Sequence, residues 1–396
     1  MRPDAAPPQP AADEVPVPLT GIHVVELGGS VAAPYATEIL ADLGAHVVKV
    51  EKPDGGDDAR GWGPPFWHGA SSAFQVLNRN KYSVTVDLKD PGELARLRNY
   101  IAAQADVVIQ NMRPGIVDRI GLGAEALRRR KPALIYCNLG AFGAHGPERM
   151  KPGYDPLMQA FGGIMSVTGE NDRPPVRVGT SIIDMGTGLW CVVGILAALN
   201  RRSASGEGST IDSSLYETAL AWMANPAASY AASGEVPTRH GSGMPMIVPY
   251  QAFPASDGYM VVASPTDTMF YKLAEVLGHP EWRDDPRFAH NPERVAQRGV
   301  LVPLIESVMR TQPREHWRAR LEAVGVPCAV LQTVDEVLAH PQTQALGILQ
   351  PVPGLDMTQI GLPLSFDGQR PTVRLRPPRV GEHTDLILNS YSKDEP

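Results

Sequence analysis

The sequence has few of the patterns that mark secreted, metal-binding or membrane-spanning proteins. Its three cysteines, Cys137, Cys191 and Cys328, are far apart, and none forms a C-x-x-C pair. An odd number of widely spaced cysteines favours reduced thiols, so we expect a cytoplasmic protein with no disulfide and no bound metal. The longest apolar run, residues 189–199, is about half of the ~20 residues that a membrane-spanning helix needs, so we expect no membrane partner.

An excess of positive charge is also absent. The formal net charge is −7 and the isoelectric point is about 5.8, which argues against a nucleic-acid partner. Local basic residues can still bind a phosphorylated ligand. Residues 1–18 lack the apolar segment of a secretory signal and are rich in proline and alanine, so we predict a disordered tail there.

Short apolar runs alternate with helical patterns over the first half of the chain. Runs at residues 22–27, 46–51, 83–88, 106–111 and 133–138 are typical of buried parallel strands, and helical spacing occurs at residues 32–43 and 91–104. This alternation predicts an α/β fold with a Rossmann-like large domain at residues 19–224. After residue 224 the composition changes, and we predict a smaller α/β domain at residues 225–325. Residues 326–396 are expected to return to the large domain, with strand character at residues 364–380.

The first strand, its glycines and the next strand outline a nicotinamide-dinucleotide site. Gly28-Gly29-Ser30 follows the first strand, and Glu51 ends the second. However, the turn lacks the G-x-G-x-x-G pattern, and Glu51 is followed by Lys52, which suits a phosphate better than a ribose diol. These details argue against a nicotinamide cofactor.

Asp184 precedes a long apolar helix that we predict from residue 185 to 199. An acidic residue here can cap the helix, because its oxygens accept the first unpaired N–H groups. It can also be a nucleophile that the helix N-terminus keeps ionised. Gly186 and Gly188 would leave room for a ligand to approach. The residue pattern alone leaves both interpretations open.

A set of short phrases resembles one enzyme family when taken in chain order. The phrases are Val48-Lys49-Val50-Glu51-Lys52-Pro53, Gly56-Asp57 with Arg60, Asn78-Arg79-Asn80-Lys81, Val84-Thr85-Val86-Asp87-Leu88-Lys89, Asn111-Met112-Arg113-Pro114-Gly115, Gly153-Tyr154-Asp155, Asp184-Met185-Gly186-Thr187-Gly188, Gly241-Ser242-Gly243 and Gly381-Glu382-His383-Thr384. Together they resemble the class III CoA-transferases, which include formyl-CoA and carnitine CoA-transferases. The resemblance covers residues 19–388 and implies the family III fold with two chains threaded into an interlocked homodimer.

The resemblance also implies a chemistry and its residues. Asp184 would attack an acyl-CoA thioester, forming aspartyl anhydride and aspartyl-CoA intermediates. Gly241 and Gly243 would offer N–H donors to the oxyanion. CoA would be a substrate, with no permanently bound cofactor. The residues expected to contact it are Val31, Ala32, Lys52, Val86, Asp87, Leu88, Lys89, Asn111, Met112, Arg113, Arg119, Pro152, Gly153, Tyr154 and Asp155.

Two alternatives remain beside CoA transfer. The related α-methylacyl-CoA racemases need a histidine base where this chain has Tyr154, and a phenol suits proton abstraction near neutral pH less well than an imidazole. A non-catalytic CoA-binding protein would not need Asp184.

For the substrates, we expect succinyl-CoA or another small dicarboxylyl-CoA as donor and a small carboxylic acid as acceptor. Arg60, or else Arg177 or Arg239, is expected to meet the second carboxylate.

Overall fold

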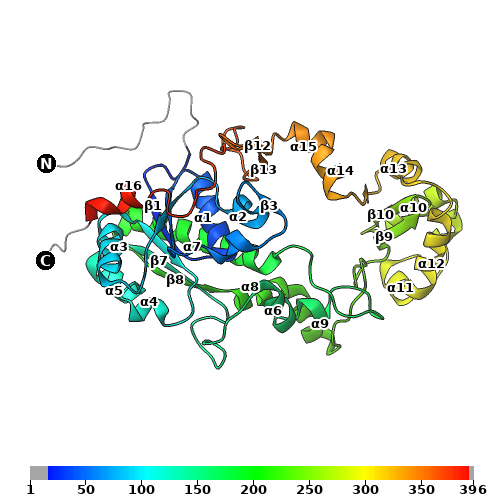
Figure 1. Cartoon of the computed structure of the whole chain (residues 1–396). Helices are drawn as coiled ribbons and strands as arrows, with labels where there is room; N and C mark the ends of the chain where they lie inside the picture. The colour runs from blue at the N-terminus through cyan, green and yellow to red at the C-terminus, as the bar shows by residue number, and fades with distance from the viewer. Residues whose placement is uncertain (1–16, 392–396) are drawn as a thin grey trace. The chain divides into compact units, whose positions relative to one another are not determined.

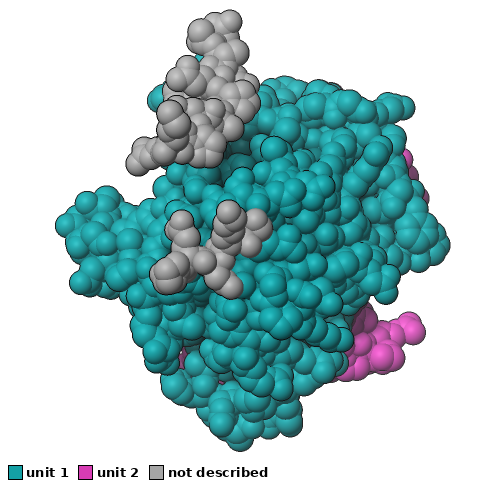
Figure 2. Space-filling model, turned by 60° about the vertical axis from the view of Figure 1, so that its left-hand side comes forward, with its two compact units in different colours: residues 1–163, 178–225, 344–396 teal, residues 164–177, 226–343 magenta. Residues whose placement is uncertain are grey.

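The computed structural model describes residues 17–391, so the predicted tail at residues 1–18 lies outside the described residues except for its last two positions. The chain forms two compact units, coloured separately in Figure 2. Residues up to 163, 178–225 and from 344 on form the first unit, and residues 164–177 and 226–343 form the second. Residues 326–343, which we expected to return to the large domain, are grouped with the second unit because strand β11 (Cys328–Val330) pairs with β10 (Gly258–Ala263).

The first unit is built on a six-stranded parallel sheet with the order β5-β2-β1-β6-β7-β8. Its strands are β1 (His23–Leu27), β2 (His46–Glu51), β5 (Lys81–Thr85), β6 (Val107–Gln110), β7 (Ile135–Gly140) and β8 (Thr210–Ser214). The strand order reverses between β1 and β6, as in doubly wound dinucleotide-binding folds, where ligands bind beyond the carboxyl ends of the strands. The prediction of a Rossmann-like domain is therefore confirmed.

Helices cover both faces of this sheet (Figure 1). Successive side chains of a strand point to opposite faces. In β1, Val25 and Leu27 join an apolar core with α3 (Pro91–Gln104), α5 (Ala124–Arg130) and α16 (Thr384–Leu388). Glu26 between them accepts a hydrogen bond from Thr37 of α1 (Ala32–Asp42). Helix α1 therefore lies on the opposite face, where it packs against α7 (Ile182–Ser205).

Helix α7 is longer than the apolar run in the sequence indicates. By length and composition it is the one helix among residues 17–391 that could span a membrane, with a mean hydropathy of 1.9 over its most apolar window. Its buried side, which includes Cys191, Val192 and Ile195, packs against β7 and β8, as in the core helix of a globular domain. Its other side exposes apolar residues.

The second unit has its own sheet and core. Strands β9 (Tyr250–Ala255), β10 and β11 form an antiparallel sheet in the order β11-β10-β9. They pack with helices through Phe253, Met260, Phe270 and Leu301. The helices of this unit include α10 (Asp267–Leu277), α11 (Asn291–Ala296), α12 (Arg298–Met309), α13 (Arg314–Ala323) and α14 (Val334–Ala339).

The C-terminal segment of the first unit closes an edge of the large sheet, but not as a strand. The prediction of a strand within residues 364–380 is wrong. This segment forms no strand, and its prolines lack an N–H to donate to a neighbouring strand. Arg374 and Leu375 instead donate their backbone N–H groups to Asn80 Oδ1, at 2.7 and 2.8 Å. Further on, the His383 N–H donates to the Ser83 carbonyl oxygen of edge strand β5, at 2.8 Å.

The remaining elements are short. Within residues 17–391 they are β3 (Phe66–Trp67), β4 (Ala70–Ser71), α2 (Ser72–Leu77), α4 (Ile116–Arg119), α6 (Asp155–Phe161), α8 (Leu215–Trp222), α9 (Ala224–Ser233), α15 (Pro341–Ala345), β12 (Leu349–Pro351), β13 (Thr358–Ile360) and the 3₁₀ turns η1 (Asp58–Gly61), η2 (Ile164–Ser166), η3 (Pro280–Arg283) and η4 (Asn389–Tyr391).

Candidate active site

A cavity of about 950 Å³ lies at the carboxyl ends of the parallel strands in the first unit. Its wall includes the segments that follow β1, β2, β5, β6 and β7, together with the start of α7. This is the position at which doubly wound sheets bind their ligands. The sheet topology therefore brings together segments that are up to about 180 residues apart in the chain.

Most of the residues expected to contact CoA line this cavity. They are Val31, Ala32, Lys52, Val86, Asp87, Leu88, Lys89, Asn111, Met112, Arg113, Pro152, Gly153, Tyr154 and Asp155, and Asp184 lines the same cavity. Sequence reasoning missed other lining residues, among them Trp62, Lys151, Ser181 and Leu215. Lys151 directly precedes the predicted Pro152–Asp155 segment, so its charge beside that segment was an available signal.

The structure does not bring Arg60 or Arg119 to the cavity. The Arg60 guanidinium donates to both Glu51 carboxylate oxygens, at 2.8 and 2.7 Å, and to the Pro378 carbonyl oxygen. It also stacks over the Phe74 ring, 3.8 Å from the centroid. These contacts occupy the fork that a substrate carboxylate would need. Arg119 is exposed on α4, and its Nε donates to the Gly115 carbonyl oxygen at 3.3 Å.

The predicted glycine loop belongs to the second unit. Gly241 has a positive φ of 59°, and its N–H donates to the Gly169 carbonyl oxygen at 3.0 Å. A Cβ at Gly241 would lie 2.2 Å from Glu170 Oε1, which belongs to a flexible side chain, so the left-handed φ is the main local reason for a glycine there. The Gly243 N–H donates to His240 O at 2.8 Å. Arg239, an alternative substrate ligand, donates to the carbonyl oxygens of residues 170, 171 and 173 in the same unit.

Exposed cations stand around the cavity in the first unit. Lys52, Lys89, Arg113 and Lys151 line it and are exposed. Lys52 pairs with Asp58 at 2.5 Å, but both side chains are more than half exposed, so this ion pair costs little to exchange for another anion. The cavity therefore offers several exposed cations to a ligand that carries phosphates.

Asp184 does not cap its helix. Helix α7 begins at Ile182 with Ser181 in the N-cap position, which places Asp184 in the first turn. The cap is supplied by Asp155 of α6, which is 3% exposed. Its Oδ2 accepts the N–H groups of Ile183 and Asp184 at 2.7 and 3.2 Å, and its Oδ1 accepts from Gln159 at 2.5 Å. The capping interpretation of Asp184 is wrong, and the capping carboxylate comes from a neighbouring helix.

The environment of Asp184 favours its protonated form. Burial, and next the negative charge of Asp155, raise the pKa of Asp184 to about 7. The expected stabilisation of the carboxylate by the helix N-terminus is smaller than these two effects, because the helix charge is offset by the Asp155 carboxylate bound to the same N–H groups. Near neutral pH the free protein therefore holds Asp184 in both protonation states.

The two glycines after Asp184 serve helix packing. A Cβ at Gly186 would lie 2.8 Å from the Trp222 ring, and a Cβ at Gly188 would lie 2.7 Å from the Ala32 carbonyl oxygen. They therefore bring α7 close to α8 and to the first turn of α1, and the expectation that they leave space for a ligand is wrong. The result is that the first turn of α1 and Asp184 lie in one wall of the cavity.

The site combines a titratable carboxylate with several exposed cations. No histidine is among the described residues that line it, and no group of three or more His, Cys, Asp or Glu between residues 17 and 391 could hold a metal. The model of one known family, described as CoA-transferase family III, matches residues 19–384. The chain belongs to CoA-transferase family III. It is therefore a CoA-transferase, and CoA thioesters are its substrates.

Named relatives in this family are similar over nearly their whole length. A succinate–glutarate CoA-transferase of Agrobacterium fabrum is 37% identical over 381 residues, which are 94% of this chain and 95% of the relative. An acetyl-CoA:oxalate CoA-transferase of Acetobacter aceti is 36% identical, covering 96% and 97%. The crystal structure of a CAIB/BAIF family protein from Brucella suis superposes with a TM-score of 0.85 at 39% identity, covering 95% of this chain and all of that one.

Proposed function

We propose that this CoA-transferase moves CoA from succinyl-CoA, or another small dicarboxylyl-CoA, to a small carboxylic acid, and that Asp184 is the attacking group. The observation that carries the proposal is that Asp184 lies in the same strand-end cavity as the exposed cations Lys52, Lys89, Arg113 and Lys151. A CoA thioester has phosphates at one end and its reacting carbonyl at the other. The cavity thus offers complementary groups to both ends of that substrate.

The proposed reaction proceeds in balanced covalent steps. The Asp184 carboxylate attacks the thioester carbonyl, CoA thiolate leaves, and an aspartyl–acyl anhydride forms. The thiolate attacks the aspartyl carbonyl of the anhydride, which releases the donor acid and leaves an aspartyl-CoA thioester. The acceptor carboxylate then displaces the thiolate to form a second anhydride. Attack of the thiolate on the acceptor carbonyl gives the new acyl-CoA and restores the Asp184 carboxylate.

The residues around Asp184 fit the demands of these steps. Only the ionised carboxylate attacks, and its pKa of about 7 leaves that form available at neutral pH. A nucleophile whose carboxylate is destabilised by burial is also more reactive than a solvated one. Asp155 holds the Ile183 and Asp184 N–H groups and so orients the first turn of α7. The Gly241 and Gly243 oxyanion donors stay a prediction.

The names of the relatives support the proposal that small carboxylic acids are the substrates. Two that are 37% identical are named for succinate with glutarate and for succinyl-CoA with D-citramalate, the second from Chloroflexus aurantiacus. The cavity wall beside Asp184 includes Ser181, Tyr154 and Leu215, and no described histidine lies in it. The absence of an imidazole base from this wall favours transfer over racemisation.

A panel of acyl-CoA donors and carboxylic acids, with products identified by mass spectrometry, tests the proposal. We expect exchange with succinyl-CoA and C4–C6 dicarboxylates, and loss of exchange in Asp184→Ala with CoA binding retained. If no dicarboxylate exchanges, the substrate proposal fails. If Asp184→Ala turns over at the wild-type rate, the nucleophile proposal fails.

We further propose that the protein is a cytoplasmic homodimer. The outward side of α7 exposes Leu189, Trp190 and Val193 by 44–50%, and Trp222 of α8 by 42%. A contiguous apolar face of this kind is typical of a protein–protein interface. A second copy of the chain, as in an interlocked dimer, is the occupant that we propose for it.

A further inference from the structure

A lysine is fully buried beneath the cavity, where no step of the proposed transfer uses it. The ammonium group of Lys49, on β2, lies 2.6 Å from Glu26 Oε1, 2.8 Å from Asp57 Oδ2 and 3.0 Å from the Gly28 carbonyl oxygen. The ammonium donates to Glu26 Oε1 and to the Gly28 carbonyl oxygen, and its charge pairs with the Asp57 carboxylate, so its partners are protein groups. Lys49 therefore acts on its protein neighbours and not on a ligand.

Stability alone does not explain this ion pair. Replacing buried ion pairs with apolar residues of similar volume is often neutral or stabilising. Glu26 also has other partners, because Lys81 Nζ lies 3.0 Å from its Oε2 and the Thr37 hydroxyl donates to it at 2.6 Å. The distinctive partner of Lys49 is thus Asp57, which connects it to the cavity wall.

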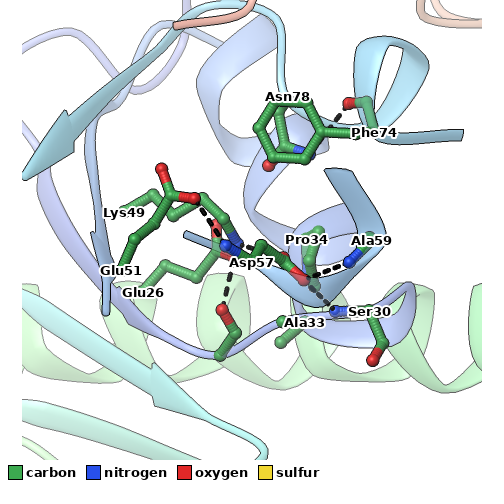
Figure 3. A network of polar contacts seen from close by, with 12 residues as sticks. Glu26, Ser30, Ala33, Pro34, Lys49, Glu51, Asp57, Ala59, Phe74 and Asn78 are labelled. Carbon is green, nitrogen blue, oxygen red and sulfur yellow. Dashed lines mark hydrogen bonds and ion pairs between the residues drawn. The ribbon is translucent and has the colours of Figure 1, made fainter. Parts of the chain in front are cut away.

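Asp57 links Lys49 to the turn between β1 and α1 (Figure 3). While its Oδ2 pairs with Lys49, its Oδ1 accepts the N–H groups of Ser30 at 3.1 Å and Ala59 at 3.0 Å. Ser30 has a φ of 68°, in the left-handed region that a residue other than glycine rarely adopts. Such a conformation persists where the surroundings hold it in place.

The turn is held from its other side as well. Asn111 accepts the Gly29 N–H at 3.0 Å and donates to the Gly29 carbonyl oxygen at 2.9 Å. Lys49 donates to the Gly28 carbonyl oxygen, and Asp57 accepts the Ser30 N–H. Each residue of the turn is therefore bound by a side chain from a different segment. The N–H groups of Gly29 and Ser30 are therefore taken by side chains and not offered to a phosphate, unlike those of a dinucleotide-binding turn.

The turn leads directly into the part of α1 that packs beside Asp184. Helix α1 begins two residues after Ser30, and a Cβ at Gly188 would lie 2.7 Å from the Ala32 carbonyl oxygen. Gly188 is four residues after Asp184, so the two lie on one side of α7. A shift of the turn would therefore move Val31 and Ala32 relative to Asp184, in the wall that the thioester must contact.

We propose that Lys49 and Asp57 are positioning residues for CoA transfer. Their ion pair holds the Ser30 turn, and through it the first turn of α1, at the distance from Asp184 that the reacting thioester requires. The inference rests on the proposed role of Asp184. It also assigns a purpose to the Lys49 and Gly56-Asp57 motifs, neither of which supplies a group to the reaction itself.

The test uses isosteric and truncated variants of the full-length protein. Asp57→Asn keeps an oxygen that can accept from Ser30 but loses the charge that binds Lys49, whereas Asp57→Ala loses both. Lys49→Met keeps the side-chain length without the charge. Asp42→Asn is the matched control, because Asp42 forms a buried ion pair with Arg79 at 2.7 Å in the same unit and does not line the cavity.

The expected signature is a lower kcat with little change in KM. Asp57→Asn and Lys49→Met should each lower kcat about tenfold, and the double variant about tenfold rather than a hundredfold, because both remove one link. KM for the donor acyl-CoA should change less than about threefold, and Asp42→Asn should lower the melting temperature without changing kcat. Wild-type kcat in both single variants, or fully additive losses, would overturn the proposal.

Hydrogen exchange separates this proposal from the assignment of Asp184. Peptides that cover residues 28–36 should exchange faster in Asp57→Ala than in wild type, and at the wild-type rate in Asp42→Asn. This result would support the positioning role even if Asp184→Ala retained exchange of CoA. Unchanged protection of residues 28–36 in Asp57→Ala would overturn it.

Discussion

At the scale of single residues, helix capping and attack on the substrate are assigned to two neighbouring carboxylates, whereas the sequence pattern offers both roles for Asp184 alone. Asp155 caps α7, and Asp184 lines the cavity from the first turn of the helix with its pKa raised to about 7. Because Asp155 contributes part of that increase, the capping residue also tunes the reacting residue. Two predictions follow from this arrangement.

The first concerns the pH dependence of catalysis. The attacking form of Asp184 is the deprotonated one, so kcat/KM should rise with pH through about 7 and level off above it. Asp155→Asn removes the neighbouring charge and should move the rise in kcat/KM to lower pH. The value of kcat/KM above this rise should be lower than in wild type, because the helix cap is weakened. A pH profile of the initial rates measures both effects. If kcat/KM rises at the same pH in Asp155→Asn as in wild type, the charge of Asp155 does not raise the pKa of Asp184.

The second concerns stability. An ordinary aspartate in the unfolded chain titrates near 3.8, whereas Asp184 in the folded protein titrates at about 7. Between these values the folded state binds the extra proton, so this group lowers stability as pH rises towards 7. Asp184→Asn should therefore be more stable than wild type at pH 8, by about 1–3 kcal/mol, and the difference should vanish near pH 4. Denaturant unfolding at both pH values measures it, and equal stability at pH 8 would contradict the raised pKa.

The sequence was informative about which residues matter, but less so about how each is used. Asp184, Lys52 and Asp155 could be chosen because ordered motifs carry them, and all three line the cavity. Arg60 could not be excluded in the same way, because its partner Glu51 and the stacked Phe74 come from separate segments. Its role depends on contacts that only the folded chain shows.

At the scale of elements, the strands were predictable and the helix contacts were not. The runs at residues 46–51 and 91–104 match β2 and α3 in full, because buried parallel strands and a proline-started helix leave strong local patterns. Strand β9 lies next to a segment rich in glycine and proline and was missed. The close contact of α1 with α7 depends on Gly188, whose local pattern is equally compatible with a ligand-binding glycine.

Gly188→Ala tests this helix contact. The added Cβ would lie 2.7 Å from a backbone oxygen of α1, which cannot rotate away, so the helices must separate. We expect a loss of about 1–3 kcal/mol in stability and a clear loss of activity. Gly194→Ala in the same helix is the control, because its Cβ would meet only the Ile211 side chain at 3.1 Å. Equal stability and activity in the two variants would argue against a tight α1–α7 contact.

At the scale of the whole molecule, the two units have separate cores, and α7 carries apolar side chains that are exposed among the described residues 17–391. The proposed homodimer predicts a solution mass twice the 42.7 kDa of one chain, without detergent. Val193→Glu should weaken the dimer, because it places a charge in the centre of an apolar interface. Sedimentation velocity checks both expectations. A monomer, or a protein recovered only with membranes, would contradict the proposal.

The central claim, that Asp184 carries the acyl group and CoA in turn, is tested most directly by an oxygen label. In the proposed steps, one oxygen of the acceptor carboxylate remains on Asp184 when the new acyl-CoA leaves. Cleavage after Arg177 and Arg201 releases a peptide of residues 178–201, in which Asp184 is the one acidic side chain. After turnover with an ¹⁸O-labelled acceptor acid, we predict that mass spectrometry finds ¹⁸O in this peptide. Normal turnover without label in residues 178–201 would contradict the claim.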